Sequence, residues 1–342
     1  MTRSEITIDL GALRRNARVL AEAAGEAELW AVVKANAYGH GAADCARVAL
    51  EAGARALCVA TAKEGAALRS HNPDARILVL SPLGPGEESL AREAGLEVAV
   101  SSPQLPEGIA VHVKVDTGMG RFGMSPDEAA GIDPDRVAGV MTHLATADEP
   151  DETFVRRQLE VFAEVAARFP GAMRHAANSA ATLSYPAARL DAVRCGIALY
   201  GLSPFGDEPG KHGLEPVLSW RSYLAQTKVL GSGESTGYGR RFVAEQETRI
   251  GLVPVGYGDG FRRGLAGTEV VVAGTRRRVL GTVSMDSFAV ELGEEPEGAP
   301  VTLIGDGLLA DEHARRLGTI NYEITSGIVS DPRRAERRVA DR

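Results

Sequence analysis

Lys34 is the residue of this sequence whose surroundings most suggest chemistry. It ends the apolar run Ala31-Val-Val and passes into a loop that contains Gly39 and Gly41. A lysine flanked by valine and alanine is partly desolvated, which lowers its pKa and frees its amine for Schiff-base chemistry with an aldehyde or ketone. The pattern also fits a strand-end lysine whose ammonium reaches water.

Other reactive or anion-binding residues also follow apolar runs: Asp116, Gly118, Arg121, His143, Asn178, Ser179, Arg194 and Gly196. Small hydroxyls and backbone amides in the segments 175–182 and 194–197 supply the parts of a phosphate site. A Schiff-base lysine combined with a phosphate site implies pyridoxal phosphate. Simpler structural roles stay open, because Ser179 fits a helix N-cap and His143 fits a core histidine. Lys114 also fits a barrel-interior lysine paired with Asp116.

Three tyrosines occur in unusual settings in the last third of the chain. Tyr238 and Tyr257 each lie between glycines, and Tyr322 lies in Ile-Asn-Tyr-Glu-Ile. A tyrosine between glycines can be approached closely, although ordinary turn chemistry with a packing ring also explains each one. The seven histidines and three cysteines have no metal-ligand spacing, so we expect no metal site.

The elements that would position these residues alternate between strands and helices. Strand-like runs occur near 29–33, 55–60, 76–80, 96–100, 110–115, 137–142, 172–176 and 191–195. Eight strands alternating with helices predict an α/β fold, a parallel (β/α)8 barrel of the TIM type with its active site at the carboxyl ends of the strands. Lys34 and the eight reactive or anion-binding residues from Asp116 to Gly196 each follow or end one of these runs. All of them would therefore face the same rim of the barrel.

Helix signals support this alternation. Thr61 with Glu64 and Ser125 with Glu128 have the spacing of capping boxes. The residues 151–169 form the clearest amphipathic helix, with one continuous apolar stripe.

After residue 213 the chain becomes rich in Val, Leu and Thr with glycine-containing turns, which predicts a mainly β domain. We expect three parts: residues 1–8 as an edge strand that joins the β domain, 9–213 as the barrel that binds pyridoxal phosphate, and 214–342 as the β domain. Residues 310–317 have the pattern of one short helix. The arginine-rich residues 331–342 suggest a solvated or disordered end.

Composition narrows the class of protein. The formal charge of -8 argues against nucleic acid or an anionic membrane surface as a partner. The three cysteines, Cys45, Cys58 and Cys195, lie in apolar contexts and suggest free thiols in a reducing compartment. The chain also has no signal-peptide pattern and no run that could span a bilayer. We therefore expect a cytoplasmic enzyme that acts on a small molecule.

Nine segments together resemble the alanine racemase family, whose members combine a barrel that binds pyridoxal phosphate with a C-terminal β domain. In this sequence they are AVVKANAYGHG from Ala31, VKVDTGMGRFG from Val113, MTHLATAD from Met141, ANSAA from Ala177, VRCGI from Val193, GYG from Gly237, GYGDG from Gly256, SMD from Ser284 and NYE from Asn321. Each motif is weak alone, but nine in order are specific. The resemblance covers nearly the whole chain.

The resemblance implies a role for each matching residue. Lys34 would carry the cofactor and exchange the α-proton on one face of the substrate, and Tyr238 of the partner subunit would act on the other face. His143 would tune that tyrosine, and Arg194 would contact the pyridine nitrogen. The remaining implied cofactor contacts are Tyr38, Asn178, Ser179, Gly196, Ile197 and Tyr322. The implied substrate contacts are Arg121, Met285 and Tyr257, together with Lys114, which is carbamylated in several members of the family.

The implied function is the interconversion of L-alanine and D-alanine by a homodimer with shared sites, which would supply D-alanine for peptidoglycan. A broad-specificity or serine racemase stays open, because substrate breadth depends on the pocket around Tyr257 and Tyr322. The alternative outside the enzymes is a protein that carries pyridoxal phosphate without catalysing a reaction. Such carriers lack the β domain, and so they lack an equivalent of Tyr238. A basic-amino-acid decarboxylase shares the barrel, but its partner for the ring nitrogen is acidic, unlike Arg194.

Overall fold

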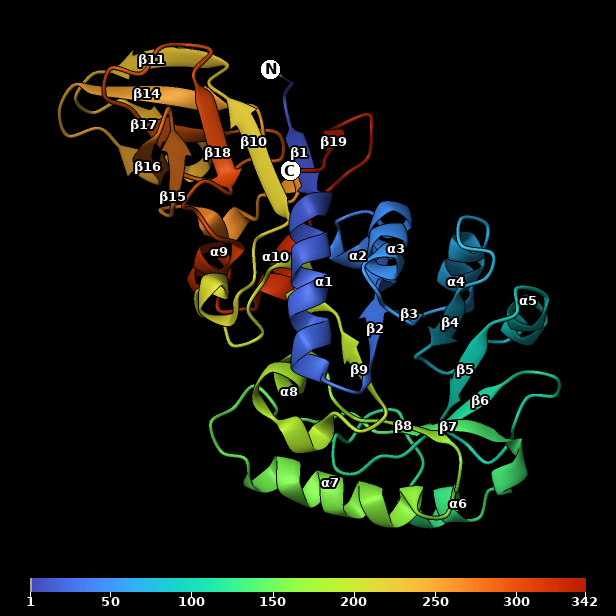
Figure 1. The fold of residues 1–342 in the computed structure, drawn as a ribbon. Coiled ribbons are helices and arrows are strands. Elements are labelled where there is room, and N and C mark those ends of the chain that lie inside the picture. Colours follow the sequence, from blue (N-terminus) through green and yellow to red (C-terminus); the bar gives the residue numbers. More distant parts are fainter. Residues whose placement is uncertain (1) are drawn as a thin grey trace. The chain divides into compact units, whose positions relative to one another are not determined.

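The protein, described by a computed structural model over residues 2–342, consists of two compact units. One unit comprises Ala12–Glu215, and the other combines the residues up to Gly11 with Pro216–Arg342. Figure 1 labels the elements of both units in chain order.

The unit Ala12–Glu215 is a closed barrel of eight parallel strands in sequential order. The strands are β2 (Glu28–Val32), β3 (Ala56–Val59), β4 (Arg76–Val79), β5 (Glu97–Val100), β6 (Val111–Lys114), β7 (Val137–Met141), β8 (Met173–His175) and β9 (Ala192–Cys195). Pairing of β2 with β9, which places Trp30 opposite Arg194, closes the barrel. The predicted (β/α)8 fold is therefore confirmed, and all eight strands overlap the predicted runs.

Helices connect the strands of the barrel. They are α2 (Lys34–Tyr38), α3 (Ala42–Glu51), α4 (Ala62–Arg69), α5 (Glu87–Glu93), α6 (Pro126–Ala130), α7 (Thr153–Ala166) and α8 (Ser179–Ser184). Both predicted capping boxes are present, at the start of α4 and of α6. The predicted helix over 151–169 is α7, which buries Val155 and Phe162 on its inner face. Ahead of the barrel, α1 (Leu10–Ala24) buries Leu13 and Leu20.

The other unit is built on a nine-stranded sheet in the order β11-β14-β17-β16-β15-β18-β10-β1-β19. Its strands are β1 (Glu5–Asp9), β10 (Leu218–Tyr223), β11 (Gln226–Leu230), β14 (Thr248–Val253), β15 (Glu269–Val272), β16 (Thr275–Leu280), β17 (Phe288–Glu291), β18 (Pro300–Ile304) and β19 (Glu336–Ala340). The short strands β12 (Ser235–Thr236) and β13 (Phe242–Val243) form a separate hairpin. The helices α9 (Ala310–Leu317) and α10 (Asn321–Ser326) follow β18, and α9 has the predicted bounds.

Two predictions about the chain ends were wrong, and they share one cause. The tail is not a disordered end, because β19 pairs in parallel with β1. As a result β1 is not an edge strand but lies between β10 and β19. Acidic partners neutralise the arginines of the tail, since Arg338 pairs with Glu5 at 3.0 Å and Arg334 with Asp259 at 2.8 Å. The charge run is therefore compatible with an ordered strand.

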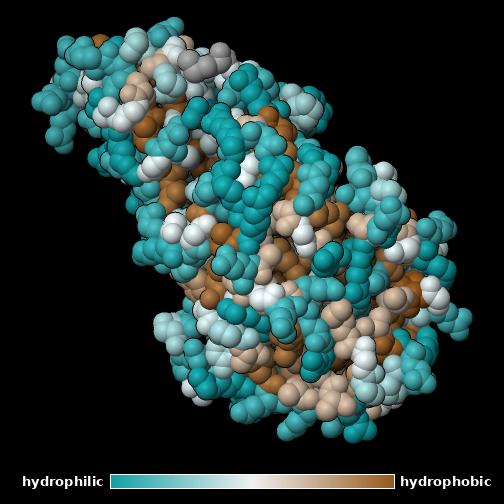
Figure 2. All heavy atoms as spheres, in the orientation of Figure 1, coloured by the Kyte–Doolittle hydropathy of each residue, from teal (hydrophilic) through white to brown (hydrophobic). Residues whose placement is uncertain are grey.

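Hydrophilic side chains cover most of the face drawn in Figure 2, with apolar side chains visible between them. Over residues 2–342, no helix combines the length and the apolar character that crossing a membrane requires.

Candidate active site

Lys34 begins one turn of left-handed helix directly after β2. Ala35, Asn36, Ala37 and Tyr38 all have φ between 51° and 55°. The left-handed conformation costs about 1–2 kcal/mol per residue for side chains other than glycine. Hydrogen bonds hold the turn in place, because Glu64 Oε1 accepts from Ala35 N at 2.7 Å and Asn36 Oδ1 accepts from Ala42 N at 2.9 Å. The strained residues directly follow Lys34, and strained backbone of this kind is common in active sites.

Cationic groups surround Lys34 and lower the pKa of its amine. Burial is the largest cause, and the charges of Arg121 and Arg194 act in the same direction, while Glu64 opposes them. Lys114 belongs to the same group, since burial and the nearby charges of Arg194, Arg121 and Lys34 lower its pKa to about 8. The cluster can therefore bind an anion, and it keeps a fraction of the Lys114 amine neutral near pH 8.

The direct pairing of Lys114 with Asp116 that the sequence suggested is not observed. Lys114 Nζ donates to the carbonyl of Leu80 at 3.4 Å. The carboxylate of Asp116 instead accepts the backbone N–H groups of Gly118 and Gly120 at 2.9 and 3.1 Å. Asp116 thus shapes the loop that carries Arg121.

Arg194 is 4% exposed and is held by the barrel through both of its Nη atoms. Nη1 donates to Nδ1 and to the carbonyl of His175 at 2.9 and 2.8 Å. Nη2 donates to the carbonyls of Thr142 and Ala176 at 2.8 and 3.1 Å, with His143 Nδ1 at 3.4 Å. The fifth N–H, on Nε, donates no hydrogen bond to any group among residues 2–342. Burial lowers the Arg194 pKa to about 10, so the guanidinium stays charged at neutral pH.

His143 is neutral at physiological pH in this setting. Burial, followed by the charges of Arg194 and Arg121, lowers its pKa to about 3. The backbone of His143 is fixed by Gln158 of α7, whose Nε2 donates to the His143 carbonyl at 3.1 Å and to Thr117 Oγ1 at 3.2 Å. Gln158 was missed at the sequence level. Its polar side chain on the buried stripe of an amphipathic helix is the signal that could have found it.

A small polar cradle lies where β8 and β9 end. Ser179 Oγ accepts from the backbone N–H groups of Gly196 and Ala198 at 3.0 and 3.4 Å. Glycine at position 196 avoids a clash, because a Cβ there would lie 2.5 Å from Tyr38 Oη. The N-cap of α8 is Asn178, whose Oδ1 accepts from Ala181 N at 3.0 Å, so the N-cap role considered for Ser179 was wrong. Ile197 begins the buried 3-10 turn Ile197–Tyr200.

In the other unit, the loops of Tyr257 and Met285 are bonded to each other. The Met285 carbonyl accepts from Gly258 N at 2.9 Å, and the Ser284 carbonyl accepts from Tyr257 N at 3.0 Å. Buried Asp259 anchors this pair, since it accepts from Gly256 N and pairs with Arg3 and Arg334. Tyr257 and Met285 remain 41% and 53% exposed.

Tyr238 is 74% exposed. It starts the 3-10 turn Tyr238–Arg240, and its carbonyl accepts from Thr282 Oγ1 at 2.9 Å. Tyr322 lies on α10 and is half-buried. The barrel therefore brings together Lys34, Tyr38, Lys114, Arg121, His143, Asn178, Ser179, Arg194, Gly196 and Ile197, whereas Tyr238, Tyr257, Met285 and Tyr322 belong to the second unit.

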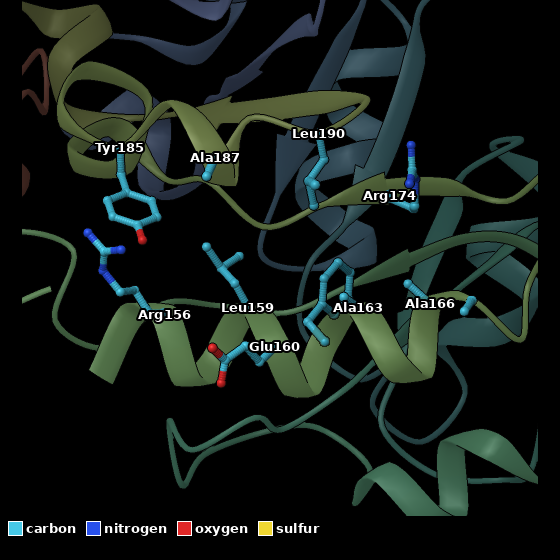
Figure 3. Close-up of a pocket in the computed structure, with 11 residues that line it drawn as sticks. Arg156, Leu159, Glu160, Ala163, Ala166, Arg174, Tyr185, Ala187 and Leu190 are labelled. Atoms are coloured by element: carbon cyan, nitrogen blue, oxygen red, sulfur yellow. The ribbon is translucent and has the colours of Figure 1, made fainter. Parts of the chain in front are cut away.

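A pocket on the outside of the barrel does not include any predicted site residue. It has a volume of about 480 Å³ and lies between α7 and the segment that follows α8. In Figure 3, Leu159 and Ala163 of α7 face Tyr185, Ala187 and Leu190 across it. We assign it no part in the chemistry.

The fold defines the class of the protein: a parallel eight-stranded α/β barrel, a fold whose enzymes have their active sites at the carboxyl ends of the strands. The sequence matches the profile "Alanine racemase, N-terminal domain" over residues 8–204 and "Alanine racemase, C-terminal domain" over residues 217–338. It is 40% identical over 352 residues to the alanine racemase of Symbiobacterium thermophilum, which covers 94% of this chain and 93% of that protein.

Solved structures agree with this match. The alanine racemase of D-cycloserine-producing Streptomyces lavendulae has a TM-score of 0.94 and 37% identity, covering 100% of this chain and 98% of that one. The alanine racemase of Bartonella henselae, solved with covalently bound pyridoxal phosphate, has a TM-score of 0.91 and 27% identity, covering 99% and 100%. This chain belongs to the alanine racemase family.

Proposed function

We propose that this enzyme interconverts L-alanine and D-alanine with pyridoxal phosphate, and that it supplies D-alanine for peptidoglycan. The observation that carries the proposal is the position of Lys34, at the barrel rim at the start of a left-handed turn. The same unit holds the polar cradle of Ser179 and Gly196 and the buried guanidinium of Arg194, four of whose five N–H groups are bonded. Membership of a family of pyridoxal phosphate-dependent isomerases supports the same reaction. We place the enzyme in the cytoplasm, in keeping with its three free, buried cysteines.

The residues of the barrel fit the cofactor. Lys34 would hold it through Nζ, and the cradle of Tyr38, Ser179 and Gly196 would bind its phosphate, with Asn178 and Ile197 beside it. A Cβ at position 196 would lie 2.5 Å from Tyr38 Oη, so glycine here lets the tyrosine hydroxyl approach the backbone closely. Tyr322 is proposed as a further phosphate contact. When bound, pyridoxal phosphate withdraws electrons from the amino acid and so makes its α-hydrogen removable as a proton.

Racemisation needs one proton-transfer group on each face of the substrate. A lowered pKa makes Lys34 Nζ a competent base on one face. Tyr238 of the partner subunit would act on the other face. His143 Nδ1 faces the Arg194 donor, so the neutral ring carries its proton on Nε2 and can donate it to the hydroxyl of the partner's Tyr238. Such a hydrogen bond would favour the phenolate form.

Arg194 would direct the reaction toward racemisation. Four of its five N–H groups are bonded within the barrel, which leaves Nε–H as the donor for the ring nitrogen of the cofactor. A guanidinium keeps its proton at neutral pH, so the ring nitrogen stays unprotonated. An unprotonated ring is the weaker electron sink, which favours return of the proton to the α-carbon.

The substrate carboxylate would be bound by Arg121 and by the backbone N–H of Met285 of the partner subunit. Tyr257 of the partner subunit would narrow the pocket. Carbamylation of Lys114 requires a neutral amine, and a pKa of about 8 leaves part of the population neutral under physiological conditions. The resulting carboxylate would offset the cationic cluster and orient Arg121.

A head-to-tail homodimer follows from this assignment. Tyr238, Met285 and Tyr257 are large side chains that a single chain leaves exposed, at 74%, 53% and 41%. Their exposure leaves these side chains available to a partner subunit. In a symmetric dimer the same contact occurs twice, so that two shared sites form.

The proposed reaction is tested by incubating the purified enzyme with L-alanine in deuterated water. Decay of optical rotation to zero together with deuterium at the α-carbon supports alanine racemisation. Rotation that holds for alanine but decays for L-serine would replace alanine by serine as the substrate. Rotation that holds for both would refute the racemase assignment, even if the absorbance of bound cofactor is present.

A further inference from the structure

A hydrogen-bonded chain crosses the barrel interior and ends on Arg194. At the far end, Arg76 Nε donates to Glu97 Oε1 at 2.7 Å. Glu97 Oε2 lies 2.8 Å from His112 Nε2, and His112 Nδ1 lies 2.8 Å from His175 Nε2. His175 Nδ1 then lies 2.9 Å from Arg194 Nη1. Both imidazoles are fully buried, whereas the side chains of Arg76 and Glu97 are 27% and 20% exposed.

The two ends of the chain determine the direction of every hydrogen bond in it. Arginine can only donate, so Nδ1 of His175 must accept from Arg194 and the proton of His175 must be on Nε2. That proton is donated to Nδ1 of His112, whose own proton is then on Nε2. The Nε2–H of His112 is donated to Glu97, which is an acceptor in its charged form. Only one arrangement of protons therefore satisfies all of the contacts.

The barrel strands leave space for this chain of hydrogen-bonded side chains. Its members come from β4, β5, β6, β8 and β9, and the intervening strand β7 contributes Gly139 at the crossing point. A Cβ at Gly139 would lie 2.2 Å from His112 Nδ1, so any larger residue would displace the imidazole. Trp30 covers the pair, with its ring centroid 5.8 Å from that of His112 and 4.6 Å from that of His175.

The charge states agree with this arrangement. Burial lowers the pKa of His175 well below its ordinary value, and it also lowers the pKa of His112. The pKa of Glu97 is lowered despite its partial burial, because His112 and Arg76 stabilise the carboxylate. Two neutral imidazoles between a carboxylate and a guanidinium form the chain at neutral pH.

We propose that Glu97 is a positioning residue for the reaction: through His112 and His175 it keeps Arg194 in the orientation that presents Nε–H to the ring of the cofactor. The inference rests on the proposed function, since it assumes that Arg194 contacts that ring. Without an acceptor at position 97, the proton of His112 can move to Nδ1. Nδ1–H of His112 would then face Nε2–H of His175, which favours the other tautomer of His175 as well. That tautomer places N–H against the Nη1 donor of Arg194 and releases one of its anchors.

Wild-type protein gives the first test, because ¹⁵N NMR of its seven histidines distinguishes the two tautomers without any amino acid present. Signals are assigned from single His→Gln variants. We expect both His112 and His175 to carry the proton on Nε2. A proton on Nδ1 of either residue would overturn the proposal. This result does not depend on racemisation, so failure of the proposed function would be recognised separately, by the absence of alanine racemisation in the wild type.

Two variants then show whether the hydrogen-bond acceptor at position 97 or its negative charge is required. Glu97→Gln keeps an acceptor oxygen for His112, so we expect the wild-type tautomers and a kcat within about twofold of wild type. Glu97→Ala removes the acceptor, so we expect a mixed tautomer signal at His175. Outer hydrogen-bond partners of metal ligands contribute about 10–100-fold, and by analogy we expect kcat to fall at least about tenfold with KM nearly unchanged.

Asp191→Ala is the matched control. Its carboxylate pairs with Arg174 at 2.8 Å next to the start of a barrel strand, as that of Glu97 does with Arg76, but it does not contact the buried chain. This control should leave the tautomers and kcat unchanged. Equal losses of kcat in Glu97→Gln and Glu97→Ala, or an unchanged His175 tautomer in Glu97→Ala, would contradict a positioning role.

Discussion

The two units of this chain present their predicted site residues in opposite ways. The barrel buries or half-buries most of its groups, with Arg121 as an exposed exception, and Arg194 is 4% exposed and bonded through both Nη atoms. The β unit exposes its groups, with Tyr238 at 74% and Met285 at 53%. A buried, preorganised group can hold a cofactor with little reorganisation, whereas an exposed one is available to another molecule. The difference fits the proposal that the barrel holds the cofactor and that the β unit completes the site of a partner subunit.

Lys34→Ala tests the role proposed for the barrel and should have the largest effect on racemisation. It removes both the attachment of the cofactor and one proton-transfer group, so we expect racemisation to fall at least roughly 10⁴-fold. Absorbance of bound pyridoxal phosphate should fall as well. Lys63→Ala, at an exposed position on α4, is the control and should resemble the wild type. Substantial activity in Lys34→Ala would remove Lys34 from the mechanism.

Tyr238→Phe tests the role proposed for the β unit and should leave the cofactor bound. Loss of one general acid–base group typically costs about 10²–10⁴-fold, and we expect kcat to fall within that range. Cofactor absorbance and thermal stability should stay unchanged, because Tyr238 is exposed. Tyr223→Phe in β10 removes a hydroxyl from the same unit and serves as the control. A kcat equal to that of wild type would exclude Tyr238 as a base.

Gly196→Ala tests the close approach in the phosphate cradle. The added Cβ would lie 2.5 Å from Tyr38 Oη, so we expect pyridoxal phosphate to bind about tenfold more weakly. Gly210→Ala is matched to it, because no atom lies within 4 Å of a Cβ at that position. Titration of cofactor into the apoprotein measures both variants. Equal affinities would show that the cradle does not bind the phosphate.

The smallest expected effect concerns the acid stability of the barrel. The folded-state pKa of His143 is about 3, compared with an ordinary value of 6.5. As the pH falls below about 6.5, the unfolded chain binds a proton that the folded chain does not, so this histidine destabilises the fold progressively toward pH 3. His143→Gln should therefore lose roughly 2 °C less in Tm than wild type between pH 7 and pH 5. The exposed His71→Gln should behave as wild type, and an equal loss in all three proteins would contradict the assigned pKa.

The sequence predicted the barrel well because its strands are local apolar runs bounded by turns and caps. The left-handed turn after Lys34 was not predictable, since Ala35 and Ala37 favour an ordinary right-handed helix. Its hydrogen bonds come from the side chains of Asn36 and Glu64, and Glu64 lies 29 residues away from the Ala35 N–H that it accepts. Local propensity carries no information about such a partner.

The contacts that hold Arg194 were invisible for the same reason. Its partners Thr142 and His175 lie 52 and 19 residues away, and they become neighbours only when the barrel closes. The tail was mistaken for a solvated end because its pairing partner, β1, lies at the opposite end of the sequence. Charge alone suggested disorder, and acidic partners such as Glu5 reverse that expectation.

Mixed dimers test the central claim, that Lys34 of one subunit works with Tyr238 of the partner subunit. Lys34→Ala and Tyr238→Phe chains carrying different tags are co-expressed, and alanine racemisation is measured in the purified heterodimer and in the unseparated mixture. If sites are shared, each heterodimer has one site with both groups intact, so random pairing returns roughly one quarter of the wild-type activity per subunit. A mixture and a heterodimer no more active than the two parent variants would contradict the account, because each chain would then need its own lysine and its own tyrosine.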